Sequence, residues 1–211
     1  MPQGSVLGPL LFLLYINDLH EAIKFSEVTL FADDTTMFQF GASLKSLSDH
    51  VNVDLTLLRD WLNANKIALN ASKTEFVLFK SRLISFDSEI EIFIDGRKLT
   101  PSSSIKYLGV IIDQHLTWSD HTSDISAKLR RANGALSKLR HFLPNPILIN
   151  IYHAIFNSHL RYACQLWGQY DSKYSHRILI LQKFALRLIS FSEPRSASSC
   201  LLYTSPSPRD A

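Results

Sequence analysis

Cysteine is scarce in this sequence. Its 211 residues include two cysteines, Cys164 and Cys200, whose spacing matches no pairing pattern and no ligand pattern. This argues against a fold held together by disulfides and against a cysteine-based zinc site. Reduced thiols fit a reducing compartment, so we expect an intracellular protein, in the nucleus or the cytoplasm.

Long apolar runs are also missing. The longest, from Val6 to Ile16, falls far short of the roughly 20 residues that cross a bilayer. The N-terminus has no basic stretch of the kind that opens a secretory signal peptide. The apolar content of 46% still suffices for one or two small cores. We therefore expect a soluble protein with no membrane partner.

The whole chain has no large excess of either charge, but its first half is acidic and its second half is basic. The formal net charge is +3. Residues 1–118 hold ten Lys and Arg against fourteen Asp and Glu, whereas residues 119–191 hold ten against three. A basic second half suits contact with phosphates, although ordinary basic helix faces would look the same.

Apolar periodicity predicts the regular elements. Residues 5–23 are apolar nearly all round, which predicts a buried helix that Ser5 caps. Strands with turn residues between them predict a hairpin over 28–38, with Asp33 and Asp34 at its tip, and another with Asp95-Gly96 as its turn. The remaining predicted helices are 44–69, 120–141, 147–167 and 174–189, and the remaining strands are 75–79, 90–94, 97–99 and 105–112.

These elements predict an α+β unit over residues 1–117 and a helical unit over 118–192. Residues 193–211 read as a disordered Ser/Pro-rich tail. Within that tail, residues 200–210 resemble the translation of an adapter used in sequencing libraries, so they are not expected to belong to the fold.

Asp33 and Asp34 carry the clearest chemistry. Two adjacent carboxylates on a tight turn offer the oxygen ligands that Mg²⁺ prefers, and two-metal sites use such ligands in nucleotidyl transfer. The alternative is bland, because aspartate favours turns for reasons of backbone geometry alone.

The context of this pair favours the chemical reading. Upstream lies Pro2-Gln3-Gly4-Ser5-Val6-Leu7-Gly8-Pro9-Leu10-Leu11-Phe12, and Phe31-Ala32-Asp33-Asp34 follows some two dozen residues later. Together they resemble blocks B and C of reverse transcriptases from non-LTR (LINE-type, jockey-like) retrotransposons. The resemblance implies an RNA-directed DNA polymerase with a partial right-hand palm, an antiparallel sheet with packed helices, followed by an all-helical thumb.

The resemblance also implies roles for individual residues. Asp33 and Asp34 would be catalytic and bind Mg²⁺ (or Mn²⁺), and Gln3, Gly4 and Ser5 would contact template and nucleotide. Leu69 to Glu75 resembles block D, in which Lys73 would assist the leaving pyrophosphate, although a solvated loop lysine is the alternative. Residues 106–110 resemble block E, in which Tyr107, Leu108 and Gly109 would form the primer grip, although a core strand with a packing glycine would read the same. Asp113 to Trp118, followed by His121, resembles the junction between palm and thumb.

The basic helices would form the thumb, with an RNA template, a DNA primer and dNTPs as partners. Aromatic residues of this region are expected in the thumb core rather than against bases. They are Tyr152, Phe156, Tyr162 and Trp167. Candidate nucleic-acid contacts are Lys128, Arg130, Arg131, Lys138 and Arg140.

The likeness begins at block B, without the fingers and without block A, which would supply a third metal-binding aspartate. We therefore expect this chain to be inactive alone, with an exposed sheet edge and uncovered apolar surface. Two alternatives to an enzyme stay open: a non-catalytic remnant that binds nucleic acid, and a pseudogene product. A telomerase or a group II intron maturase is a weaker family alternative.

Overall fold

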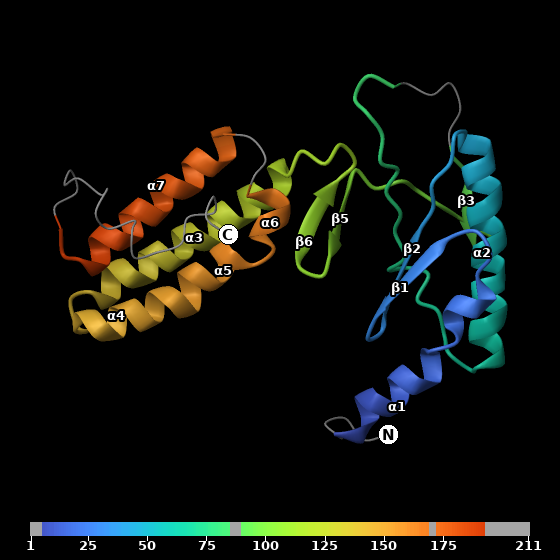
Figure 1. Cartoon of the computed structure of the whole chain (residues 1–211), viewed down its shortest axis with the longest axis horizontal. Coiled ribbons are helices and arrows are strands. Elements are labelled where there is room, and N and C mark those ends of the chain that lie inside the picture. Colours follow the sequence, from blue (N-terminus) through green and yellow to red (C-terminus); the bar gives the residue numbers. More distant parts are fainter. Residues whose placement is uncertain (1–5, 85–89, 169–171, 193–211) are drawn as a thin grey trace. The chain divides into compact units, whose positions relative to one another are not determined.

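The structure is a computed structural model that describes residues 6–84, 90–168 and 172–192, with the backbone alone for 172–174. The chain divides into two compact units, residues 1–102 (unit 1) and 103–211 (unit 2) (Figure 1). The expected boundary after residue 117 thus lies inside unit 2, because the β-hairpin that precedes it groups with the helices. The observed mixture of helices and small antiparallel sheets is compatible with the expected α+β class.

Unit 1 consists of two hairpins and three helical segments. Its elements are α1 (Leu7–Ile16), a 3-10 turn (Leu19–Ala22), β1 (Glu27–Phe31), β2 (Asp34–Phe38), α2 (Leu44–Ala64), β3 (Ile92–Ile94) and β4 (Arg97–Leu99). Strands β1 and β2 pair antiparallel, as do β3 and β4. Both predicted hairpins are therefore confirmed, including the turn at Asp95-Gly96.

Helix α2 organises unit 1. The side chain of Ser43 caps its N-terminus by accepting a hydrogen bond from the backbone N–H of Ser46, 3.2 Å away. One stripe of the helix, with Leu58 and Leu62, packs against the inward face of the β1–β2 hairpin. Another packs against the buried isoleucines of β3. The apolar spacing of three and four residues is what gives one helix two such contacts.

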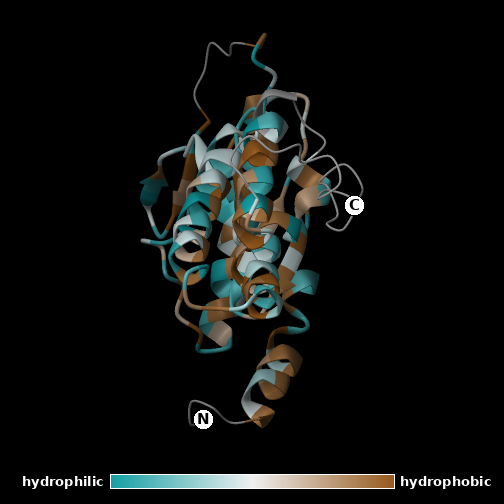
Figure 2. Ribbon diagram, turned by 90° about the vertical axis from the view of Figure 1, so that its left-hand side faces the viewer, coloured by the Kyte–Doolittle hydropathy of each residue, from teal (hydrophilic) through white to brown (hydrophobic). Residues whose placement is uncertain are grey.

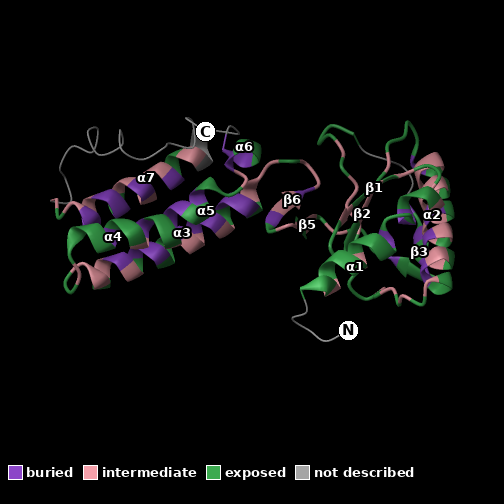
Figure 3. Ribbon diagram, turned by 60° about the horizontal axis from the view of Figure 1, so that its bottom comes forward, coloured by how far each residue is buried: buried purple, intermediate pink, exposed green. Residues whose placement is uncertain are grey.

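The first helix differs from its prediction over 5–23 in extent and in burial. Helix α1 ends at Ile16, and a separate 3-10 turn follows it. Figure 2 colours α1, beside the N mark, largely hydrophobic, and Figure 3 colours most of it exposed. Leu10 is 55% exposed and Leu14 67% exposed, and Ile16 is the buried residue of this helix. A helix that is apolar all round needs cover on every side, and the described parts of unit 1 cover only its C-terminal end.

The predicted strand over 75–79 is also wrong. This segment makes one isolated parallel bridge, from Phe76 to Pro101, and no ladder. The N–H of Ser102 donates to the carbonyl of Phe76 at 2.9 Å. Phe76 and Leu78 still pack against the core beneath α2, whereas Phe79 is 46% exposed. Burial of alternate side chains, rather than strand pairing, thus accounts for the apolar residues at 76 and 78.

Unit 2 begins with a hairpin and continues as helices. Its elements are β5 (Ser104–Tyr107), β6 (Val110–Asp113), α3 (Ser119–Leu139), α4 (Asn145–Ile151), a π-helical segment (Tyr152–Asn157), α5 (Ser158–Arg161), α6 (Cys164–Trp167) and α7 (Ser172–Ile189). Its core joins α3, α7 and the helical segments between them, around Leu129, Leu136, Phe156 and Ile178.

Two predictions for unit 2 need correction. The single strand over 105–112 is instead a hairpin, because Leu108 and Gly109 adopt positive φ of 45° and 84° and reverse the chain. The single helix over 147–167 is broken by a π-helical segment and by Ala163, whose φ is 51°. Neither break carries a proline, so the sequence offered no local signal for it.

The other predicted helices are present, with α3 and α7 within a few residues of their expected limits. The predicted end of α2 at residue 69 is wrong, because the helix ends at Ala64, just before Lys66 adopts a positive φ of 56°. Three of the four aromatic residues expected in the core are buried: Tyr152, Phe156 and Trp167. Tyr162 is 54% exposed, which corrects the fourth. Among the described helices, none combines the length and the apolar character needed to cross a membrane.

Candidate functional site

The β1–β2 hairpin presents the two candidate aspartates at its turn. Phe31 pairs with Asp34, which leaves Ala32 and Asp33 as a two-residue loop. Ala32 has a φ of 52°. A positive φ at the first loop residue is the pattern of a type II′ turn, in which glycine is the usual occupant. Both aspartates are exposed.

The base of this hairpin is held by a buried carboxylate on α2. Asp54 is 0% exposed and accepts backbone N–H groups from three consecutive residues. Lys24 donates to Oδ1 at 3.0 Å, Phe25 donates to both oxygens, and Ser26 donates to Oδ2 at 2.7 Å. These residues lead directly into β1, so Asp54 sets where the strand begins.

A histidine on the same helix touches both ends of the hairpin. The ring of His50 stacks on Phe25, with centroids 4.2 Å apart and planes 5° from parallel. Its Nδ1 lies 3.3 Å from the amide nitrogen of Gln39, which follows β2. With Asp54, this contact fixes the hairpin against α2 and leaves its turn projecting.

The carboxylates of Asp33 and Asp34 are the type of ligand that a hard cation takes, but two of them are too few to fill its coordination. Within the described parts of the chain, neither forms a hydrogen bond or an ion pair. Their oxygens are therefore free to act as ligands of the kind that Mg²⁺ takes. No group of three or more His, Cys, Asp or Glu suited to a metal gathers among the described residues, so two carboxylates are all that this hairpin offers.

Lys73 lies in a turn, where its N–H donates to the carbonyl of Asn70 at 3.0 Å, and its side chain is exposed. The described contacts do not bring its ammonium to either aspartate. Gln3, Gly4 and Ser5, with the predicted cap of the first helix, lie outside the described residues.

Tyr107, Leu108 and Gly109 form the turn of the β5–β6 hairpin. The hydroxyl of Tyr162 donates to the carbonyl of Leu108, which ties this turn to the segment after α5. A Cβ on Gly109 would meet the Tyr162 ring at 3.5 Å, an ordinary contact. Glycine is thus required here for its φ of 84° rather than for space.

The junction between β6 and α3 is built around the Asp113 carboxylate. It accepts backbone N–H groups from His115, Thr117 and Trp118 and the hydroxyl of Thr117, at 2.8 to 3.1 Å. Burial raises its pKa, but these hydrogen bonds outweigh that effect and hold the pKa of Asp113 below its ordinary value of 3.8. Leu116 and Trp118 both adopt positive φ in this loop.

His121, at the start of α3, completes the junction. Its Nδ1 accepts the N–H of Ile111 at 3.2 Å, and its ring meets Trp167 edge-on. Burial lowers its pKa below 6.5; the nearby charge of Asp124 has a smaller raising effect, and that of Lys128 a smaller lowering effect. The imidazole is thereby held neutral, as a structural link between β6 and the helices.

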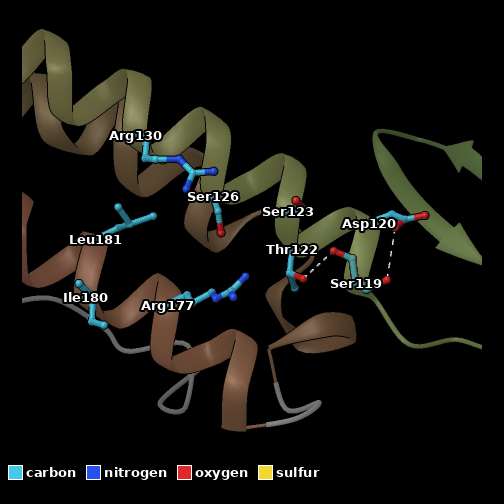
Figure 4. Close-up of a pocket in the computed structure, with 9 residues that line it drawn as sticks. All are labelled: Ser119, Asp120, Thr122, Ser123, Ser126, Arg130, Arg177, Ile180 and Leu181. Atoms are coloured by element: carbon cyan, nitrogen blue, oxygen red, sulfur yellow. Dashed lines mark hydrogen bonds between the residues drawn. The ribbon is translucent and has the colours of Figure 1, made fainter.

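The five basic candidates on α3 and just after it differ in their surroundings. Arg130, Arg131 and Lys138 are exposed. Lys128 is paired with Asp124 at 2.8 Å, and the Arg140 guanidinium lies 5.2 Å from the centroid of the Phe191 ring. Only Arg130 also lines a cleft of about 530 Å³ between α3 and α7, together with Arg177 (Figure 4).

A family model described as "Reverse transcriptase (RNA-dependent DNA polymerase)" matches residues 1–112, more than half of the chain. The chain belongs to the reverse transcriptase family. The match covers the hairpin that carries Asp33 and Asp34, and it ends within β6.

Curated relatives place it among the reverse transcriptases of non-LTR retrotransposons. The chain is 30% identical over 200 residues to the "Probable RNA-directed DNA polymerase from transposon X-element" of Drosophila melanogaster, covering 92% of this chain and 22% of that protein. It is equally identical over 200 residues to the "RNA-directed DNA polymerase from mobile element jockey" of the same species, covering 90% of this chain and 22% of that protein. A relative from the R1 element of Bradysia coprophila is 24% identical over 86% of this chain.

The chain spans about a fifth of the length of these relatives. No solved structure matches it.

Two residues that hold the chain together locally, Asp54 and Asp113, are not among the site residues predicted from the sequence. Asp54 lies within the predicted helix over 44–69, yet it is fully buried. Asp113 was noted only as part of a motif, yet it caps four donors. One signal was available for Asp54: it sits between Val51, Leu55 and Leu58, on the apolar stripe where a charge is unexpected.

Proposed function

We propose that this chain is part of an RNA-directed DNA polymerase of a non-LTR retrotransposon, in which Asp33 and Asp34 are metal-binding catalytic residues. The observation that carries the proposal is a projecting hairpin turn whose two carboxylates have no described partner, in a chain of the reverse transcriptase family. In this assignment residues 1–117 are palm and residues 118–192 are thumb.

A divalent ion, Mg²⁺ or Mn²⁺, bound there would supply charge neutralisation for the 3′-hydroxyl and the phosphates of the incoming nucleotide. The role of this chain is to hold the two carboxylates at a fixed place, through the ladder of β1 and β2 and the anchor at Asp54. The exposed ammonium of Lys73 would donate a proton to the leaving pyrophosphate.

Gln3, Gly4 and Ser5 would contact template and nucleotide. The Tyr107-Leu108-Gly109 turn would hold the primer end, and two features support this role. Its backbone bends sharply, and Tyr162 braces it from the helices of unit 2.

Two carboxylates are fewer ligands than Mg²⁺ requires, since it takes about six oxygens in octahedral geometry. We therefore expect weak metal binding and no DNA synthesis by the chain alone. The test measures Mn²⁺ binding by electron paramagnetic resonance and primer extension on an RNA template, for the parent chain and for Asp33→Asn/Asp34→Asn.

Asp95→Asn is the matched control, because Asp95 also lies in an exposed hairpin turn of unit 1. The proposal expects Mn²⁺ binding to be lost in the double variant and kept in the control. Equal binding by all three proteins would show that the aspartates are ordinary turn residues. Processive extension by the parent chain would refute the expected inactivity.

A second candidate function is sequence-independent binding of nucleic acid without catalysis. The observation in its favour is the exposed basic surface of unit 2, with Arg130, Arg131 and Lys138 free of described ion pairs. Such binding would weaken steeply with salt. Binding that persists when Asp33 and Asp34 prove not to bind Mn²⁺ would favour this candidate.

A further inference from the structure

Helices α3 and α7 enclose a cleft in unit 2 that the sequence motifs do not include. Its volume is about 530 Å³, within the range of sites that hold small ligands or ligand parts. Figure 4 shows side chains from both helices converging on it. The lining residues, here called the α3–α7 cleft, are Ser119, Asp120, Thr122, Ser123, Ser126, Arg130, Arg177, Ile180 and Leu181.

Two arginines face each other across this cleft. Arg130 comes from α3 and Arg177 from α7, and both side chains extend into the space between the helices (Figure 4). Within the described residues, neither guanidinium forms an ion pair or a hydrogen bond. Two unpaired guanidiniums facing one space repel each other unless an anion or solvent lies between them.

The Ser126 hydroxyl supplies a third donor. Ser126 is 8% exposed, and its side chain points from α3 into the cleft (Figure 4). It has no hydrogen-bond partner among the described residues. The Thr122 hydroxyl, by contrast, is already used, because it donates to the carbonyls of Trp118 and Ser119 at 2.7 and 3.0 Å.

Among the described lining residues, Asp120 is the acidic one, and it lies at one end of the cleft (Figure 4). Asp120 lies ten residues, or nearly three helical turns, before Arg130 on α3. Its carboxylate accepts the Ser119 hydroxyl at 3.3 Å. An anion would therefore occupy the end near Arg130, Arg177 and Ser126. The planar fork of arginine suits the paired oxygens of a phosphate, and a hydroxyl can complete its ligation.

We propose that the α3–α7 cleft binds a phosphodiester group of a nucleic-acid strand, held by Arg130, Arg177 and Ser126. Ile180 and Leu181 provide an apolar wall against which the adjoining sugar packs. This inference deepens the proposed function and rests on it, because membership of the reverse transcriptase family is what makes a nucleic acid the expected source of the phosphate. It also adds Arg177 and Ser126 to the candidate nucleic-acid contacts.

The test is fluorescence anisotropy of a short labelled single-stranded RNA, titrated with the full chain and its variants over a range of salt. Arg130→Ala and Arg177→Ala should each weaken binding about tenfold and lower the salt slope by about 0.7, the value for one phosphate contact on a single strand. Ser126→Ala should weaken binding a few-fold without changing that slope, because it removes a donor and no charge.

Arg131→Ala is the matched comparison, since Arg131 is the next residue on α3, is exposed and does not line the cleft. As part of the basic surface it should weaken RNA binding, but clearly less than Arg130→Ala does. Circular dichroism melts confirm that each variant folds. Losses at Arg131 equal to those at Arg130, or no loss at Ser126, would overturn the proposal and leave only diffuse attraction to a basic surface. So would binding of inorganic phosphate or dATP that depends on both arginines while RNA affinity stays unchanged.

This readout needs neither metal nor polymerase activity. A failed cleft therefore leaves the Mn²⁺ result for Asp33 and Asp34 standing, and a failed metal site leaves the RNA titration interpretable. The two proposals can be refuted separately.

Discussion

Asn in place of Asp54 should loosen the hairpin that carries Asp33 and Asp34. The carboxylate accepts the N–H groups of Lys24, Phe25 and Ser26, with both oxygens engaged. Asn keeps the shape but turns one oxygen into an NH₂ group. Whichever way the amide is oriented, at least one of the three backbone donors then faces another donor.

The cost follows from the hydrogen bonds lost. A buried N–H left without its acceptor costs about 1–3 kcal/mol, and the bonds that remain lose the charge of the carboxylate. We expect Asp54→Asn to reduce the free energy of unfolding by about 2–3 kcal/mol. Asp54→Ala removes all three acceptors and should cost more, about 4 kcal/mol, since neighbouring losses do not simply add.

The assay is urea unfolding followed by circular dichroism, with native-state hydrogen exchange of the Lys24, Phe25 and Ser26 amides to locate the effect. Asp49→Asn is the control, because Asp49 is exposed on the same helix, and it should change stability by less than about 0.5 kcal/mol. If Asp54→Asn is as stable as this control, or its three amides exchange no faster, the reasoning that Asp54 anchors the hairpin is refuted.

The remaining predictions concern unit 2. Because burial lowers the pKa of His121 below 6.5, the unfolded chain takes up that proton first. The free energy of unfolding should therefore fall as the pH drops below about 6.5. The urea midpoint of His121→Asn should lack this decrease with falling pH. The pKa of Asp113 also lies below its ordinary 3.8, so its contribution is present above that pH and lost as the pH falls through the lower folded value; acid titration of Asp113→Asn against the parent tests this. Gly109→Ala should cost about 1–2 kcal/mol in thermal melts, because its φ is 84°, whereas Gly109→Asn should cost less, and equal costs would contradict a conformational cause.

Sequence patterns predicted an element correctly where its structure depends mainly on the residues of that segment. The apolar spacing of α2, α3 and α7 predicted those helices, because apolar residues every three or four positions fall on one face only in an α-helix. The turn at Asp95-Gly96 was predicted because an Asp-Gly pair favours the two-residue hairpin turn that needs positive φ at both positions. Both residues have positive φ in the structure.

Pattern failed where the structure depends on a partner. Residues 75–79 have the composition of a strand, but a strand needs a neighbour with free N–H and C=O groups, and this segment finds one bridge. The burial predicted for α1 likewise depends on what lies against it. Residues 147–167 kept helical periodicity while Ala163 adopted a left-handed φ, which no side chain there announces.

The sequence by itself determined which residues are proposed to bind a metal ion: two adjacent carboxylates at a turn, within motifs of the reverse transcriptase family. Only the tertiary structure decided what two other carboxylates do. Asp54 anchors the start of β1 and Asp113 caps the loop before α3, although the two side chains are chemically the same. The reason is that the structural role of a carboxylate depends on which hydrogen-bond donors surround it. Those donors are backbone N–H groups, which every residue carries, and only the folded path of the chain brings particular ones to a particular oxygen.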